Sequence, residues 1–181
     1  MGKKLALSLV AGALVASIAA HAEMPGNSMG HMGHQQPMAG NDGRQLVNFP
    51  PEMRQHTLAN MRDHLEALSE ILGAISAAQY GKASQIASAR LGMDSPSAAG
   101  CKAEAAAGAA QQSRPGNMDH QMAQFMPEAM RIIGLSMHQA ASDFATEAAR
   151  TGKSGNPKPA LAALSKVTQQ CSACHAAYRV Q

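Results

Sequence analysis

The sequence predicts an all-α protein, and three observations carry this prediction. Aromatic residues are scarce, with no Trp, three Phe and two Tyr in 181 residues, so Ala, Leu and Met must fill the core. These three residues favour helices. Apolar residues also recur at spacings of three to five over long stretches, which is the helical period, and no stretch has the pattern of a strand. An antiparallel four-helix bundle with one long connection fits these stretches best.

The first residues predict export. Lys3 and Lys4 give a positive start, and the run LALSLVAGALVASIAA that follows is apolar and uncharged. A small-x-small tripeptide ends at Ala22, so residues 1–22 have the form of a secretory signal peptide that is cleaved after Ala22. The apolar run has about 16 residues, fewer than the roughly 20 that span a bilayer. We therefore expect a periplasmic protein whose mature form has no membrane span.

Residues 23–48 are expected to form a disordered leader, because they have no apolar period and are rich in Gly, Met, Asn and Gln. The leader also carries several thioether and imidazole groups, which together suit copper, with methionine favouring copper(I). A copper site in the leader is therefore one alternative, and a metal-free tail is the other. The residues concerned are Met24, Met29, His31, Met32, His34 and Met38.

Residues 49–181 are expected to form the folded domain, and its first helix is predicted over 51–79. Pro51 suits the first turn of a helix, and Gly81 is a plausible stop signal. The apolar positions of this helix are Met53, Leu58, Met61, Leu65, Leu68, Leu72 and Ile75.

A weaker helix over 82–92 follows, with Ile86 and Leu91 as its large apolar residues. Residues 93–117 then form a long connection that is punctuated by prolines and glycine. An alanine-rich stretch over 103–110 adds a helical turn or two within this connection.

The third helix is predicted to run until Gly152. Asn156 is then expected to cap the last helix, with Pro157 at its first position. The apolar positions of the third helix are Met122, Phe125, Met126, Met130, Ile133, Met137, Ala141, Phe144 and Ala148. One face of the last helix is expected to carry Leu161, Leu164, Val167 or Thr168, Cys171, Cys174, His175 and Tyr178.

Residues 171–175 read CSACH, which is the attachment sequence of c-type haem. On a helix Cys171 and Cys174 are about one turn apart, so both sulfurs reach the same side and can form thioethers with the two vinyl groups of one haem. His175, four residues after Cys171, can then bind the iron as its proximal ligand. We expect one haem c per chain.

Two other interpretations of this motif are weaker. Half of a zinc site would need two more ligands at short spacing, and only scattered histidines and Cys101 are available. A thioredoxin-like redox pair would lie at the N-terminus of a helix in a βαβ setting, whereas these cysteines lie near the end of a helix in an all-helical chain.

A CxxCH motif near the C-terminus, on the last helix of a four-helix bundle, resembles the class II c-type cytochromes, the cytochrome c-prime family. The pair Tyr178 and Arg179 after the motif resembles the aromatic-basic ending of that family. The likeness covers residues 50–181 and is most specific at CSACHAAYR. The leader and the connection over 93–117 depart from the family pattern, so the loop geometry and a homodimer are left open.

The resemblance implies that the first helix supplies the residue on the other side of the iron, roughly ten residues from its Pro-Glu start. The count from Pro51 ends near Met61, which would give a six-coordinate iron suited to electron transfer. Leu58 is the apolar alternative and would leave an open site for small gases. Met53 or a histidine is a third alternative.

The histidines near these positions are expected to have other roles. His56 and His64 flank the apolar stripe of the first helix and are expected to face solvent. His138 is expected at the edge of the core.

Three arginines are candidates for neutralising the haem propionates. Arg179 follows the motif directly, and Arg54 and Arg62 lie on the first helix. Exposure to solvent is the favoured interpretation for Arg54 and Arg62.

Cys101 has no partner once Cys171 and Cys174 hold haem. We expect it either to form an intermolecular disulfide or to remain a free thiol.

The sequence thus predicts a periplasmic electron-transfer cytochrome that works with redox partner proteins. The alternatives are a gas-binding haem protein and a copper-handling protein that uses its leader. No residues assemble a hydrolytic or group-transfer site, so we do not expect an enzyme. Without Lys3 and Lys4 the net charge falls from +3 to about +1, which gives no reason to expect a nucleic-acid partner.

Overall fold

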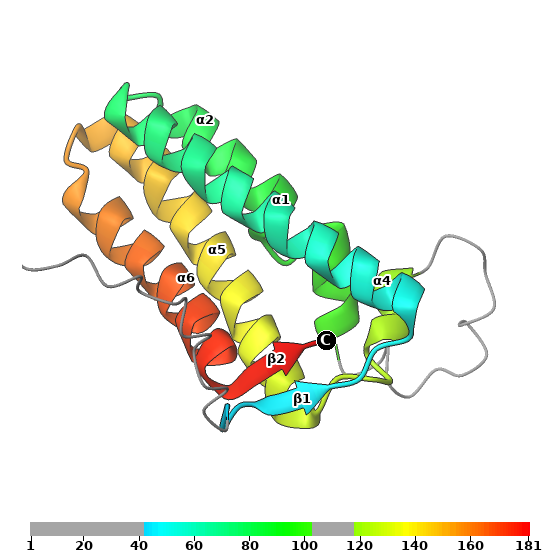
Figure 1. Cartoon of the computed structure of the whole chain (residues 1–181). Coiled ribbons are helices and arrows are strands. Elements are labelled where there is room, and N and C mark those ends of the chain that lie inside the picture. The colour runs from blue at the N-terminus through cyan, green and yellow to red at the C-terminus, as the bar shows by residue number, and fades with distance from the viewer. Residues whose placement is uncertain (1–41, 103–117) are drawn as a thin grey trace, which may run out of the picture. The chain divides into compact units, whose positions relative to one another are not determined.

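The computed structural model describes residues 42–102 and 118–181, and these ranges are mostly helical, which confirms the all-α class (Figure 1). The α-helices are α1 (Pro51–Ser76), α2 (Tyr80–Ile86), α4 (Met118–Met122), α5 (Glu128–Ser154) and α6 (Lys158–Ala177). A π-helical turn η1 (Ala87–Leu91) and a 3-10 helix η2 (Pro96–Cys101) complete the helical part, and two short strands are β1 (Gln45–Val47) and β2 (Tyr178–Val180).

The long helices lie side by side. Helix α1 packs against α2, α2 packs against α5, and α5 packs against α6 over most of its length. Within the described ranges, no helix is both long and apolar enough to cross a membrane.

Helix α1 begins as predicted and ends three residues early. Pro51 occupies its first position, and Glu52 in the first turn interacts favourably with the helix dipole. At the other end Ala78 has a left-handed backbone (φ 56°), which turns the chain before residue 79. The next helix therefore begins at Tyr80, two residues before the predicted start.

The second helix is confirmed over 80–91. Its last turn is π-helical, because the Gly92 N–H donates to the carbonyl of Ala87 at 2.7 Å, five residues back. The connection that follows contains η2, and the alanine-rich stretch over 103–110 lies outside the described residues.

The predicted third helix is two helices. Helix α4 ends at Met122, and Pro127 is the N-cap of α5 because proline has no N–H to donate within a helix. Helix α5 runs two residues beyond Gly152 and ends before Gly155, which has the left-handed conformation (φ 71°) that glycine adopts freely. The N-cap of α6 is Pro157 and not Asn156, so the helix begins one residue later than predicted. Asn156 Oδ1 still accepts the N–H of Lys158 at 3.2 Å.

Three expectations fail at the ends of the described chain. Gln45 to Val47 pair in parallel with Tyr178 to Val180, so a strand exists where none was predicted. Residues 45–47 belong to the segment expected to be disordered, yet Val47 is only 2 % exposed. Tyr178 leaves the helix for this strand (φ −128°, ψ 151°) instead of extending the helical face. Residues 1–41 lie outside the described ranges.

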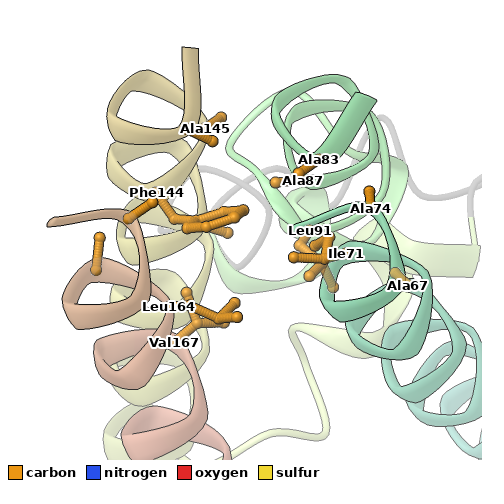
Figure 2. Packing of buried hydrophobic residues seen from close by; sticks show 14 of the residues in the cluster. Ala67, Ile71, Ala74, Ala83, Ala87, Leu91, Phe144, Ala145, Leu164 and Val167 are labelled. Carbon is orange, nitrogen blue, oxygen red and sulfur yellow. The ribbon is translucent and has the colours of Figure 1, made fainter. Parts of the chain in front are cut away.

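The main core lies between α1, the α2–η1 helix, α5 and α6. Figure 2 shows Phe144 and Leu164, from α5 and α6, on one side and Ile71 and Leu91 on the other. Phe144 and Ile71 are fully buried. Alanines supply most of the other contacts and let the helices approach closely: Ala67, Ala74, Ala83, Ala87, Ala141, Ala145, Ala148, Ala160 and Ala163.

Candidate functional site

A cavity of about 630 Å³ opens between α1, η2, α5 and α6. Ligand pockets in proteins commonly measure about 300–1,000 Å³ and are mostly apolar. The lining of this cavity is mostly apolar as well and includes five thioethers: Met61, Met122, Met126, Met130 and Met137.

The three motif residues line this cavity together. Cys171, Cys174 and His175 come from the last two turns of α6, where their helical spacing places them on one wall. Both thiols are partly buried, and burial raises the pKa of each. Both thiols are therefore protonated at physiological pH, and a protonated, partly buried thiol is a weak nucleophile.

Helix α1 supplies another wall, with Met61 and Leu58 among its lining residues. Leu58 and Leu65 are 36 % and 69 % exposed although both belong to the predicted apolar stripe, because they border the cavity instead of packing into the core. Met53 does not line this cavity. It is buried in a second cluster together with Val47.

The arginines are distributed differently from the prediction. Arg62 lines the cavity, whereas Arg54 and Arg179 do not. Arg179 Nε lies 3.6 Å from a carboxylate oxygen of Asp42. The sequence analysis missed Arg44, which holds Asp42 at 2.6 Å and lowers the pKa of that carboxyl to about 2. Arg44 Nη1 also donates to the carbonyl oxygen of His175 at 3.4 Å.

His64 lines the cavity, so the expectation that it faces solvent is wrong. Its Nε2 lies 3.0 Å from Ser97 Oγ. Burial, together with the charge of the neighbouring His138, lowers the pKa of His64 to about 4. The imidazole is therefore neutral at physiological pH.

His138 also lines the cavity and is 2 % exposed, so it lies deeper than the core edge expected for it. Its Nδ1 lies 2.7 Å from the carbonyl oxygen of Leu91, and burial lowers its pKa. His56 does not line the cavity and bonds instead to Asp119 at 2.7 Å.

Cys101 is the third thiol of the cavity wall. Burial raises its pKa to about 11, and the nearby Cys174 thiol contributes to the shift. Its sulfur packs on α5 so closely that a Cβ at Gly134 would lie only 2.5 Å from it. An intermolecular disulfide needs an accessible sulfur, so this position favours the free thiol of the two predicted alternatives.

Comparison with protein-family models, with curated proteins and with solved structures gave no match. Within residues 42–102 and 118–181, no three His, Cys, Asp or Glu side chains gather in a way that could hold a metal ion. The functional proposal therefore rests on the residues that line the cavity.

Proposed function

We propose that this chain is an exported mono-haem c-type cytochrome of the class II type, which transfers electrons between redox partner proteins. The observation that carries the proposal is that Cys171, Cys174 and His175 line one apolar cavity together with Met61. A CxxCH motif alone is a local pattern. Here the motif lies on the wall of a cavity that is large enough for a cofactor. This position supports haem attachment over a purely structural role for the two cysteines.

The architecture that fits this proposal is an antiparallel four-helix bundle formed by α1, the α2–η1 helix, α5 and α6. Helix α1 is joined to α2, and α5 to α6, by three-residue connections, over 77–79 and 155–157. Such short connections favour antiparallel neighbours. The contacts of α2 with α5 join the two pairs.

Each residue of the site has a distinct role in the proposed mechanism. Cys171 and Cys174 would hold haem through thioethers, and His175 would bind its iron from the same helix. The bound haem supplies a centre that gains and loses one electron reversibly. The apolar wall excludes water, and a thioether ligand from Met61 would favour the reduced state.

Met61 is a better candidate than His64 for the second ligand. The Nε2 atom of His64, the ring nitrogen farthest from the backbone, already hydrogen-bonds with Ser97. Met61 is partly exposed on the cavity wall, and no hydrogen bond holds its sulfur elsewhere within the described part of the chain.

Gas binding is the second candidate function, and the position of Leu58 favours it. Leu58 lines the same wall of α1, nearly one turn before Met61. If this side chain rather than Met61 faces the iron, the iron keeps an open position for nitric oxide or carbon monoxide. The proposed copper site of the leader lies outside the described residues.

Covalent attachment tests the main proposal. Haem should remain on the chain after acid-acetone extraction and denaturing electrophoresis, because thioethers survive both treatments. The double variant Cys171→Ala, Cys174→Ala should lose covalently bound haem, whereas the matched control Cys101→Ala should keep it. Wild-type protein that releases its haem freely, or that carries zinc instead, would contradict the proposal.

A further inference from the structure

Two histidines of the cavity wall are joined by a chain of hydrogen-bonding side chains. His64 Nε2 lies 3.0 Å from Ser97 Oγ, and Ser97 Oγ lies 3.3 Å from Ser95 Oγ. Ser95 Oγ in turn lies 3.5 Å from His138 Nδ1. The two imidazole rings meet edge to face with centroids 5.9 Å apart. The proposed haem attachment uses none of these four residues.

The tautomer of His138 follows from its partner. The carbonyl oxygen of Leu91, 2.7 Å from Nδ1, can only accept a hydrogen bond, so Nδ1 must carry the proton. Because burial lowers the pKa of His138, the ring is neutral at physiological pH. The other nitrogen, Nε2, therefore carries a free lone pair.

The tautomer of His64 follows from counting protons along the chain. Ser95 Oγ donates its single proton to the carbonyl oxygen of Gly92 at 2.7 Å, so it can only accept from Ser97. Ser97 then has no proton left for His64, and His64 Nε2–H must donate to Ser97 Oγ. One proton assignment thus satisfies every contact, and it leaves a lone pair on His64 Nδ1.

Each ring therefore presents one unprotonated nitrogen whose partner is not supplied by the described residues. Histidines that bind metals typically donate their other N–H to a carbonyl, hydroxyl or carboxylate, which fixes the tautomer and the orientation of the ring. His138 and His64 have this arrangement through Leu91 and Ser97. A ligand that accepts the two lone pairs would therefore stabilise the pair.

The side chains around the two histidines indicate which metal they would bind. The pair is not joined by a third His, Cys, Asp or Glu within the part of the chain that the structure describes, so the metal must accept few ligands. Both histidines line the cavity that five methionines also line. Imidazole suits copper, and thioethers select copper(I).

We propose that His64 Nδ1 and His138 Nε2 form a copper(I) site on the cavity wall, with a thioether of that wall as a third ligand. The site does not depend on the leader, because it uses only α1, α5, one cavity methionine other than Met61 and the hydrogen bonds that fix the two rings.

Anaerobic titration of the full exported chain with copper(I), in competition with a chromophoric copper(I) chelator, tests the site. His64→Gln and His138→Gln should each bind one copper(I) fewer than the wild type. His56→Gln is the matched control, because His56 is on the same helix and bonds to Asp119 outside the cavity. The leader is intact in all four proteins, so any copper that it binds cancels in the comparison.

Equal stoichiometry and affinity in all four proteins would overturn the proposal. Circular dichroism checks each variant, and if His138→Gln loses helical content, His64→Gln decides alone. After oxidation to copper(II), electron paramagnetic resonance of the wild type should show a signal with coupling to two imidazole nitrogens, and this signal should be absent from each variant. The haem proposal fails or holds separately, because covalent attachment of haem is measured by extraction and electrophoresis and not by the titration.

Discussion

The two halves of α1 have different surroundings. From Ala67 onward the helix packs on Phe144, Leu91 and alanines of the other helices. Before Leu68 the same helix borders a cavity of about 630 Å³ that is lined by methionines, leucines and the CxxCH residues. Small side chains bring helices together, and long flexible ones line the space where helices stand apart. Stability is therefore expected to come from the first region and cofactor binding from the second.

The largest expected loss of stability comes from a substitution in the packed region. Phe144→Ala should lower the free energy of unfolding by about 3–5 kcal/mol, because the ring is fully buried and its removal leaves a cavity. Leu65→Ala, at a side chain that is 69 % exposed on the cavity wall, should cost less than about 1 kcal/mol. Denaturant unfolding measures both. Similar losses for the two variants would contradict the division of α1 into two regions.

The second prediction concerns the pH dependence of the cavity region. The pKa of His64 is lowered from 6.5 to about 4 in the folded protein. The unfolded chain therefore binds more protons than the folded one between pH 6.5 and 4, and stability falls as the pH falls through this window. The loss should be on the order of 2–3 kcal/mol.

Urea unfolding at several pH values checks this prediction. His64→Gln should flatten the decline between pH 6.5 and 4, whereas His56→Gln, outside the cavity, should leave most of it. An unchanged profile in His64→Gln would show that the ring is not buried as described. His138, whose pKa is also lowered, accounts for any decline that remains.

The smallest of the three effects concerns a contact in the cavity wall. Gly134→Ala places a Cβ about 2.5 Å from Cys101 Sγ, so the Cys101 side chain or η2 must shift. Overpacking of this kind typically costs about 1–3 kcal/mol. Cys101→Ala in the same chain should recover most of the loss, and a double-mutant cycle measures the coupling. Strict additivity of the two substitutions would contradict the contact.

Features set by local spacing were predictable from the sequence. The helices over 51–76 and 80–91 and the shared wall position of Cys171, Cys174 and His175 follow from the helical period. The break before α5 was also visible, because Pro127 cannot sit in the interior of a helix. One continuous helix was predicted because the apolar positions keep the helical period across this proline.

Features set by distant contacts were not predictable. Three residues are too few to show a strand pattern, and the partner of Gln45 lies at Tyr178, near the other end of the chain. His64 was expected in solvent because it flanks the apolar stripe of α1. Ser97 and His138, which surround it, come from other elements. The burial of Cys101 likewise depends on how η2 packs on Gly134.

Optical spectra of the purified protein, oxidised and reduced, with and without carbon monoxide, test the central claim that the cavity holds haem with Met61 as a ligand. The oxidised wild type should be low-spin and show the weak sulfur-to-iron charge-transfer band, and carbon monoxide should bind the reduced form slowly. Met61→Ala should become high-spin and bind carbon monoxide rapidly, whereas Met53→Ala, outside the cavity, should retain the wild-type spectrum. A wild type that is already high-spin and binds carbon monoxide at once would contradict the claim and place Leu58 beside an open iron.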